Sequence, residues 1–257
     1  MSAEDEPLLT ERRGRILLIT INRPDQRNAV NSAVAAGIAG ALDELDSDAE
    51  LTVGVLTGAG KGFCAGMDLK AFVTGERPFI EGRGFAGITQ AGAAKPLIAA
   101  VEGFAMAGGL EIALACDLIV ASRGARLAIP EVRRGLVAAG GGLLRLPRAL
   151  PRNVAIEMAL TGDPIEADRA YALGLVNRLT EPGEALTAAL ELAETIAANG
   201  PLALAATKRI MVESADWPDS EFFERQWPIY EPVFGSEDAR EGATAFAERR
   251  APEWKGR

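Results

Sequence analysis

Short apolar runs alternate with one amphipathic stretch over the first sixty residues. Residues 15–21 form an apolar, β-branched run that the polar sequence 22–25 closes, which predicts a buried strand followed by a turn. Residues 52–57 predict a second strand, which the glycines of 58–60 end. Between the two runs, apolar side chains recur at spacings that are typical of one helix face: Val30, Val34, Ile38, Leu42 and Leu45.

The middle of the chain repeats this alternation. Residues 96–101 predict a third strand and residues 118–121 a fourth. Between them lies an apolar helix that starts at Gly108 and Gly109 and continues to Ala115. Strand, helix and strand at this spacing favour repeated crossover units, so we predict a fold of the α/β class.

Beyond Pro151 the pattern becomes helical. Residues 183–199 are rich in Ala, Leu and Glu and end at Gly200, a typical helix stop, and Pro201 suits the first turn of the next helix. Ser236 is predicted to be the N-cap of a last helix. We therefore expect a core over residues 1–195 and an all-helical region over residues 196–257.

Residues 72–94 interrupt the pattern, because they combine several glycines and a proline with no clear period. We expect a long loop or a loose helix there. Long irregular segments in compact domains are often functional, so this segment is a candidate for shaping a site.

Length and composition bound the class of protein. The 257 residues, 48% of them hydrophobic, suffice for one large domain or for one domain with an appended helical piece. No apolar run approaches the roughly 20 residues needed to span a bilayer, and the acidic residues 1–7 do not resemble a secretory signal. The chain has 2 cysteines, which favours a reducing compartment. Together these features predict a cytoplasmic protein without membrane association.

Net charge and the absence of histidine narrow the possible chemistry. The formal net charge of −9 disfavours nucleic-acid binding, which depends on a basic surface. With 0 histidines the chain has no Ser-His-Asp or Cys-His triad and lacks the ligand of most catalytic zinc sites, so we expect no metal. Acid–base work near neutral pH therefore falls first to carboxylates.

Two glycine-rich segments could present backbone amides to a ligand. Residues 58–70 superficially resemble a phosphate-binding loop, but Lys61 is followed by glycine instead of Ser or Thr, and Val55 occupies the upstream glycine position. Residues 101–111 put Gly108 at a helix start, where amides lack internal partners and carry partial positive charge. A simple turn and tight helix packing remain the alternative interpretations of these two segments.

Two glutamates are the candidate acid and base. Glu111 falls in the first turn of an apolar helix, and Glu131 follows a proline. Either glutamate alone would more often be a surface residue, but paired carboxylates beside two amide-presenting segments can divide acid and base work. Cys64, Cys116 and Asp117 are interpreted as packing or structural residues.

These segments together resemble the crotonase superfamily, also called the enoyl-CoA hydratase/isomerase family, along nearly the whole chain. The matching segments, in the order of the family, are 21–24 with Asn28 and Ala29, 63–70, 95–101, 108–111, 116–117, 130–131, 161–162, 170–177 and 241–250. The ending 236–257 is particularly similar to the carnitinyl-CoA dehydratase branch and to related bacterial enoyl-CoA hydratases.

The resemblance implies a spiral of ββα units, and a C-terminal helical region that assembles a trimer or a hexamer of two trimers. It also implies an acyl-CoA thioester substrate; coenzyme A belongs to that substrate, so no separate cofactor is expected. By motif, the amides of Met67 and Gly108 would hold the thioester oxygen, and Glu111 and Glu131 would be the two hydratase glutamates. The implied CoA contacts are Gln26, Arg27, Ala65, Asp68, Leu69, Lys70 and, from a neighbouring subunit, Arg249.

We expect a hydratase that adds water reversibly to a 2-trans-enoyl-CoA and gives 3-hydroxyacyl-CoA, with Glu111 assigned to the water and Glu131 to C2. The presence of both glutamates favours hydration or dehydration over isomerisation. The alternatives are an enoyl-CoA isomerase, a carnitinyl-CoA-type dehydratase and a non-catalytic acyl-CoA-binding protein; a two-carboxylate glycosidase fits less well, because it needs no pair of amide sites. The chain departs from the family at Ala138 and Ala139, where Pro-Gly is frequent, although Ala139 keeps its amide.

Overall fold

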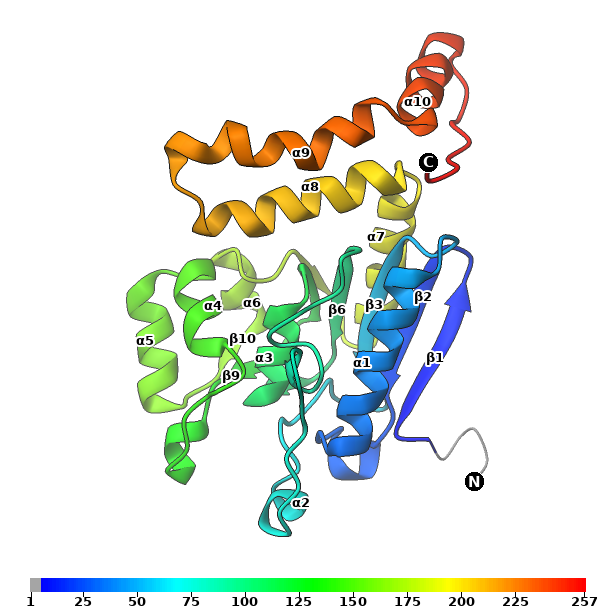
Figure 1. Cartoon of the computed structure of the whole chain (residues 1–257). Helices are drawn as coiled ribbons and strands as arrows, with labels where there is room; N and C mark the ends of the chain where they lie inside the picture. The colour runs from blue at the N-terminus through cyan, green and yellow to red at the C-terminus, as the bar shows by residue number, and fades with distance from the viewer. Residues whose placement is uncertain (1–5) are drawn as a thin grey trace.

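The computed structural model describes residues 6–257 and has a six-stranded sheet at its centre (Figure 1). Its strands in chain order are β1 (Leu8–Arg13), β2 (Ile16–Ile21), β3 (Val53–Gly58), β6 (Leu97–Val101), β8 (Leu118–Ser122) and β11 (Arg178–Thr180). The order across the sheet is β1-β2-β3-β6-β8-β11. The edge strand β1 pairs antiparallel with β2, and the other pairings in this sheet are parallel.

A smaller sheet branches from the central one. It has three strands, β7 (Phe104–Met106), β9 (Arg126–Ala128) and β10 (Ile165–Glu166), with β9 in the middle. Helix α3 (Gly108–Ala115) leads from β7 back to β8 of the central sheet. Strands β6 and β7 with α3 thus form one ββα unit, and the α/β class is confirmed.

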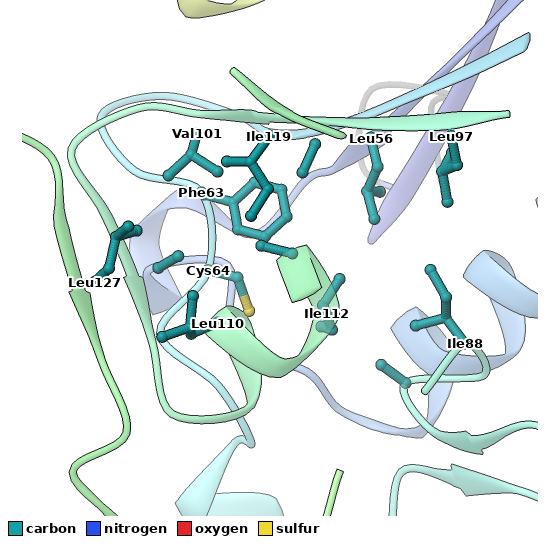
Figure 2. Packing of buried hydrophobic residues seen from close by; sticks show 14 of the residues in the cluster. Leu56, Phe63, Cys64, Ile88, Leu97, Val101, Leu110, Ile112, Ile119 and Leu127 are labelled. Carbon is teal, nitrogen blue, oxygen red and sulfur yellow. The ribbon is translucent and has the colours of Figure 1, made fainter. Parts of the chain in front are cut away.

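Both faces of the central sheet are covered, which explains why its strands read as continuous apolar runs. Ile16 and Leu18 of β2 pack with the alanines of α7 (Ala185–Ala197), whereas Leu17 and Ile19 pack on the opposite side with α1 (Ser32–Ser47). The larger of the two clusters extends under α3. Figure 2 shows Leu110 of α3 beside Cys64, with Phe63 close by.

The C-terminal region is helical, with α8 (Pro201–Glu213), α9 (Phe222–Phe234) and α10 (Glu237–Glu248). Helices α8 and α9 lie side by side above the core, and α10 follows at one end (Figure 1). The boundary expected at residue 195 falls in the last turn of α7, a helix that packs on the central sheet. Within residues 6–257, no helix combines the length and the apolar character that a membrane crossing requires.

The remaining elements are short. They are α2 (Leu69–Val73), the hairpin of β4 (Phe79–Ile80) and β5 (Gly84–Phe85), α4 (Gly142–Ala149), α5 (Arg152–Thr161), α6 (Ala167–Ala172) and four 3-10 turns: η2 (Pro24–Gln26), η3 (Glu131–Arg134), η4 (Ser214–Asp216) and η5 (Asp219–Glu221).

The sequence-based elements agree with this structure at the long apolar segments. The four predicted strands correspond to β2, β3, β6 and β8, and the predicted helix starts at Gly108, Pro201 and Ser236 are confirmed. Val30 was placed on a helix face but lies ahead of α1, in a backbone bridge with Met67. The acidic residues 1–5 lie outside the described part of the chain.

The structure differs from the sequence analysis in two segments. Residues 72–94 contain a hairpin and compact turns, with Phe85 and Ile88 buried in the core. The sequence analysis also missed β1, because its residues are mixed in character and mostly exposed. An edge strand of this kind is held by its hydrogen-bonded pairing with β2, so the apolar pattern carries little signal.

Candidate active site

A cavity of about 450 Å³ opens where the small sheet, α3 and η3 meet the segment after residue 64. It brings together four residues predicted from the sequence, which are Met67, Gly108, Glu111 and Glu131. Most of the remaining wall is apolar. The large apolar side chains of this wall are Leu69, Phe72, Phe79, Phe85, Met106, Leu136 and Val137.

Backbone hydrogen bonds hold the two glycine-rich segments side by side. Met106 donates its amide to the carbonyl of Cys64 at 2.9 Å, and Phe63 donates to the carbonyl of Phe104 at 3.0 Å. A Cβ built on Gly66 would lie 3.0 Å from the amide nitrogen of Gly108, so only glycine permits this approach. The loop before α2 and the start of α3 therefore face the same space.

Two amides at this junction have no partner within residues 6–257. Neither the amide of Met67 nor that of Gly108 donates to another group of the described chain, and both residues line the cavity. Ala107, just before α3, has φ of 53°, an uncommon value for a residue with a side chain, and sets the direction in which the helix starts. Paired free amides of this kind are suited to an oxyanion.

Gly108 also has a packing role. A Cβ at Gly108 would lie 2.4 Å from the ring of Phe85, and one at Gly109 would lie 2.2 Å from the carbonyl oxygen of Cys64. Close packing and an unpartnered amide at the cavity are thus both present at the helix start, and the two interpretations of this segment are compatible.

Glu111 is buried, with 3% of its surface exposed, and its carboxylate is held by backbone. Its Oε1 accepts a hydrogen bond from the amide of Gly142 at 2.9 Å. A Cβ on Gly140 would lie 2.6 Å from Oε2 and one on Gly142 would lie 3.1 Å from Oε1, so these two glycines make room for the carboxylate. Burial raises the pKa of Glu111, and the amides of Gly142 and Gly140 and the Arg145 guanidinium oppose that rise.

Arg145 of α4 supports the segment that holds Glu111. Its guanidinium donates to the carbonyl of Thr89 at 2.7 Å and to that of Gly140 at 3.3 Å. Within residues 6–257 it forms no salt bridge, and burial lowers its pKa. Its positive charge therefore acts on Glu111 from nearby, although the two side chains form no salt bridge.

Glu131 begins η3 and lies half-buried at the cavity wall. Its Oε2 is buried and accepts no hydrogen bond from the described part of the chain. Burial raises the pKa of Glu131 to about 7, and the nearby carboxylate of Glu111 adds to the rise, whereas its own amide and Arg134 oppose it. The two glutamates thus share a cavity but have different surroundings.

The predicted CoA contacts divide into two groups. Arg27, Ala65 and Leu69 line the cavity, whereas Gln26, Asp68, Lys70 and Arg249 are not among its lining residues. Asp68 forms a salt bridge with Arg23 at 2.9 Å and caps α2 through the amides of Lys70 and Ala71. Arg249 follows α10, at the end of the molecule opposite α2 (Figure 1).

Cys64 and Asp117, which were interpreted as structural residues, lie in surroundings that fit this interpretation. Cys64 is buried, and burial raises the pKa of its thiol to about 12. Asp117 accepts a hydrogen bond from the amide of Leu97 at 2.7 Å and forms a salt bridge with Lys208 at 2.6 Å. It therefore joins β6 to the C-terminal helices.

Sequence reasoning missed most of the cavity wall. Phe72, Phe79, Phe85 and Arg77 come from the irregular segment 72–94, for which the only available signal was its length and irregularity. A second group follows Glu131 along the chain, without a periodic pattern to mark it: Arg134, Leu136 and Val137.

Comparisons with known proteins agree with this geometry. The family model described as "Enoyl-CoA hydratase/isomerase" matches residues 11–257. The crystal structure of an enoyl-CoA hydratase from Mycobacterium marinum has a TM-score of 0.97 and 60% sequence identity, and covers 98% of this chain and 100% of that one. The observed architecture is therefore the expected crotonase-type α/β fold with C-terminal helices.

Two curated proteins give the same picture. An enoyl-CoA hydratase of Mycobacterium tuberculosis is 44% identical over 257 residues, which is 97% of this chain and 96% of that protein. A carnitinyl-CoA dehydratase of Salmonella typhi is 43% identical over 261 residues, covering 98% of this chain and 99% of that protein. From the cavity and these matches together, the chain belongs to the enoyl-CoA hydratase/isomerase family.

Proposed function

We propose that this protein is an enoyl-CoA hydratase, which adds water reversibly to a 2-trans-enoyl-CoA and forms the 3-hydroxyacyl-CoA. The observation that carries the proposal is the meeting of a buried glutamate, a half-buried glutamate and two unpartnered amides in one cavity. The two amides match the negative charge that develops on the thioester oxygen during the reaction. The two glutamates match the two proton transfers.

The amides of Met67 and Gly108 are the oxyanion hole in this proposal. Addition of water at C3 moves electrons through C2 toward the thioester oxygen, which gains negative charge. Two backbone donors at that oxygen stabilise the charge as it develops, and loss of one such donor typically costs about 2.7–4 kcal/mol. Because both donors are main chain, the side chain of Met67 is free to form part of the wall.

Glu111 and Glu131 divide the proton transfers. Glu111, held by the amide of Gly142, takes a proton from water as the water oxygen bonds to C3. Glu131, with a pKa raised to about 7 by burial, gives a proton to C2. The substrate gains one oxygen and two hydrogens, and the two carboxyls return to their starting states when Glu111 loses its proton and Glu131 regains one.

Binding of coenzyme A is assigned to one edge of the cavity. Arg27, Ala65 and Leu69 are the contacts that the cavity lining supports, and Gln26, Asp68 and Lys70 are proposed beside them on the same segments. Arg249 is proposed to reach the CoA of a neighbouring subunit in a trimer or hexamer. We place the protein in the cytoplasm, with no separate cofactor, metal, nucleic-acid or membrane partner.

A second candidate is dehydration of a carnitinyl-CoA-type substrate. It is favoured by the relative of that name, which is 43% identical to this chain. The catalytic groups would be the same, because dehydration reverses the addition of water.

Hydration of crotonyl-CoA by wild type, Glu111→Gln and Glu131→Gln tests the proposal. We expect each variant to lose about 100- to 10,000-fold in kcat, which is the usual contribution of a general acid or base. Glu166→Gln is the matched control, because Glu166 is exposed at the start of α6 and does not line the cavity.

Three outcomes would count against the proposal. Wild type without activity on short, medium and long enoyl-CoAs contradicts a hydratase, and tight CoA binding without turnover points to a binding protein. Activity that depends on only one glutamate favours an isomerase.

A further inference from the structure

The cavity lining has more basic than acidic side chains. Three arginines line it, Arg27, Arg77 and Arg134, and none of them forms a salt bridge within the described chain. The acidic side chains of the lining are Glu111 and Glu131 alone. Burial and mutual repulsion shift Glu131 toward its neutral form near pH 7, so the lining carries a net positive charge at that pH.

Arg77 is fixed in place by its own surroundings. Its guanidinium donates to the carbonyls of Phe72 at 3.1 Å and Glu76 at 2.8 Å, and its Cζ lies 4.0 Å from the centroid of the Phe72 ring. One face of the Phe72 ring is therefore already occupied by a cation. Arg134 ends η3, three residues beyond Glu131, and lowers the pKa of that glutamate through its charge.

The aromatic rings of the cavity offer little to a second cation. Quaternary ammonium groups are usually bound by several aromatic faces, with Trp the best of them, or by carboxylates. The lining has no Trp or Tyr, and its other two rings, Phe79 and Phe85, pack edge to face with centroids 5.5 Å apart. No carboxylate beyond the two glutamates lines the cavity to balance an incoming positive charge.

We infer that the acyl site accepts neutral and acidic acyl chains and excludes acyl chains that carry a quaternary ammonium, with Arg77 and Arg134 as the specificity-determining residues. The inference rests on the proposed function, because it concerns the acyl group of the same thioester. It separates this protein from a carnitinyl-CoA-type dehydratase, whose acyl group bears a trimethylammonium, although the catalytic glutamates are shared.

Binding of saturated acyl-CoAs tests the inference without turnover. The probes are butyryl-CoA and its derivatives with trimethylammonium or carboxylate at C4, and the measurement is Kd by calorimetry at low salt. We expect the cationic probe to bind about tenfold or more weakly than butyryl-CoA, which corresponds to about 1.4 kcal/mol. The anionic probe should bind at least as tightly as butyryl-CoA, and salt should narrow both differences by screening.

Variants assign the effect to the two arginines. The ratio of the cationic to the neutral Kd should fall severalfold in Arg77→Gln and in Arg134→Gln, and furthest in the double variant. Arg178→Gln is the control, because it removes the same charge from an exposed arginine of β11 that does not line the cavity, and its ratio should match wild type. Butyryl-CoA binding by each variant reports whether its site is formed.

Several results would overturn the inference. These are a cationic probe that binds within about twofold of butyryl-CoA, a ratio that stays constant in the double variant, or an anionic probe as weak as the cationic one. Failure of crotonyl-CoA hydration would instead contradict the proposed function, and the Kd ratios would still decide the charge preference.

Discussion

At the residue scale, the two glutamates differ in what surrounds the carboxylate. Burial raises the pKa of Glu111, but its amide partner Gly142 and the nearby cation of Arg145 both favour its ionised form. Glu131 has a buried oxygen without a partner, and burial raises its pKa to about 7. This asymmetry supports the proposed roles, because the group that accepts a proton from water must be ionised and the group that donates to C2 must be protonated.

The first residue-scale prediction concerns pH. We expect kcat/KM for crotonyl-CoA hydration to fall as pH rises through about 7, because Glu131 loses the proton that it must donate. Initial rates measured across the neutral pH range follow this fall in kcat/KM. Its apparent pKa belongs to Glu111 and Glu131 together, because the two carboxyls interact. Glu131→Gln should lack the limb. A wild-type profile that stays flat, or a limb that persists in Glu131→Gln, would be the contrary result.

A second prediction concerns Arg145, a positioning residue that does not line the cavity. Its charge lowers the pKa of Glu111, so Arg145→Gln should raise that pKa and move the ascending limb of the pH–rate profile to higher pH. We expect kcat to fall about tenfold or more, since the hydrogen bond to the Gly140 carbonyl is also lost.

The control for this prediction is Arg145→Lys, which keeps the charge and should retain most of the wild-type profile. If Arg145→Gln lowers activity but leaves the profile in place, Arg145 acts only in folding.

At the element scale, the site depends on how segments approach one another. Gly140 and Gly142 pass so close to α3 that a side chain on either one would meet Glu111. Helix α3 starts beside Gly66 because Ala107 turns the chain with a positive φ. The glycines of these segments allow close approach to neighbouring segments, and this role can be recognised only once the neighbours are in place.

Gly140→Ala tests this arrangement. Its Cβ would lie 2.6 Å from Oε2 of Glu111, so the carboxylate must shift, and we expect kcat to fall about 100-fold while the fold is retained. Gly40→Ala is the matched control: Gly40 lies in α1 with no atom near a built Cβ, so alanine should stabilise the protein by about 0.5–1 kcal/mol and leave activity intact. Wild-type activity in Gly140→Ala would contradict the proposed role of this segment.

At the scale of the whole molecule, the C-terminal helices present apolar side chains to solvent. Phe223, Trp227 and Phe234 of α9 are 77%, 58% and 78% exposed in the single chain. Exposed apolar groups gathered on one helix are typical of an interface between proteins. They support the proposed trimer or hexamer, in which Arg249 would reach a neighbouring site.

Light scattering at micromolar concentration tests the assembly. We expect the mass of a trimer or a hexamer, and a smaller mass in Phe223→Glu, because a charge on α9 opposes burial of its apolar side chains. The mass of Phe246→Glu is measured for comparison, because Phe246 lies on a different helix, α10, and is 87% exposed. A monomeric wild type would contradict both the assembly and the role proposed for Arg249.

From the sequence one could predict the class of fold, the long strands and helices, and, through the family resemblance, four residues that line the cavity: Met67, Gly108, Glu111 and Glu131. Such features follow from local periodicity and from short motifs whose residue types have a fixed chemical use. Folding settles which amides lack a partner in the described chain, why the pKa of Glu131 is raised, and that Arg77 and Arg134 line the same cavity as the two glutamates. These features depend on which side chains are buried, which groups form hydrogen bonds and which charges line the cavity. All three are set by segments that are distant in the chain and meet only after folding.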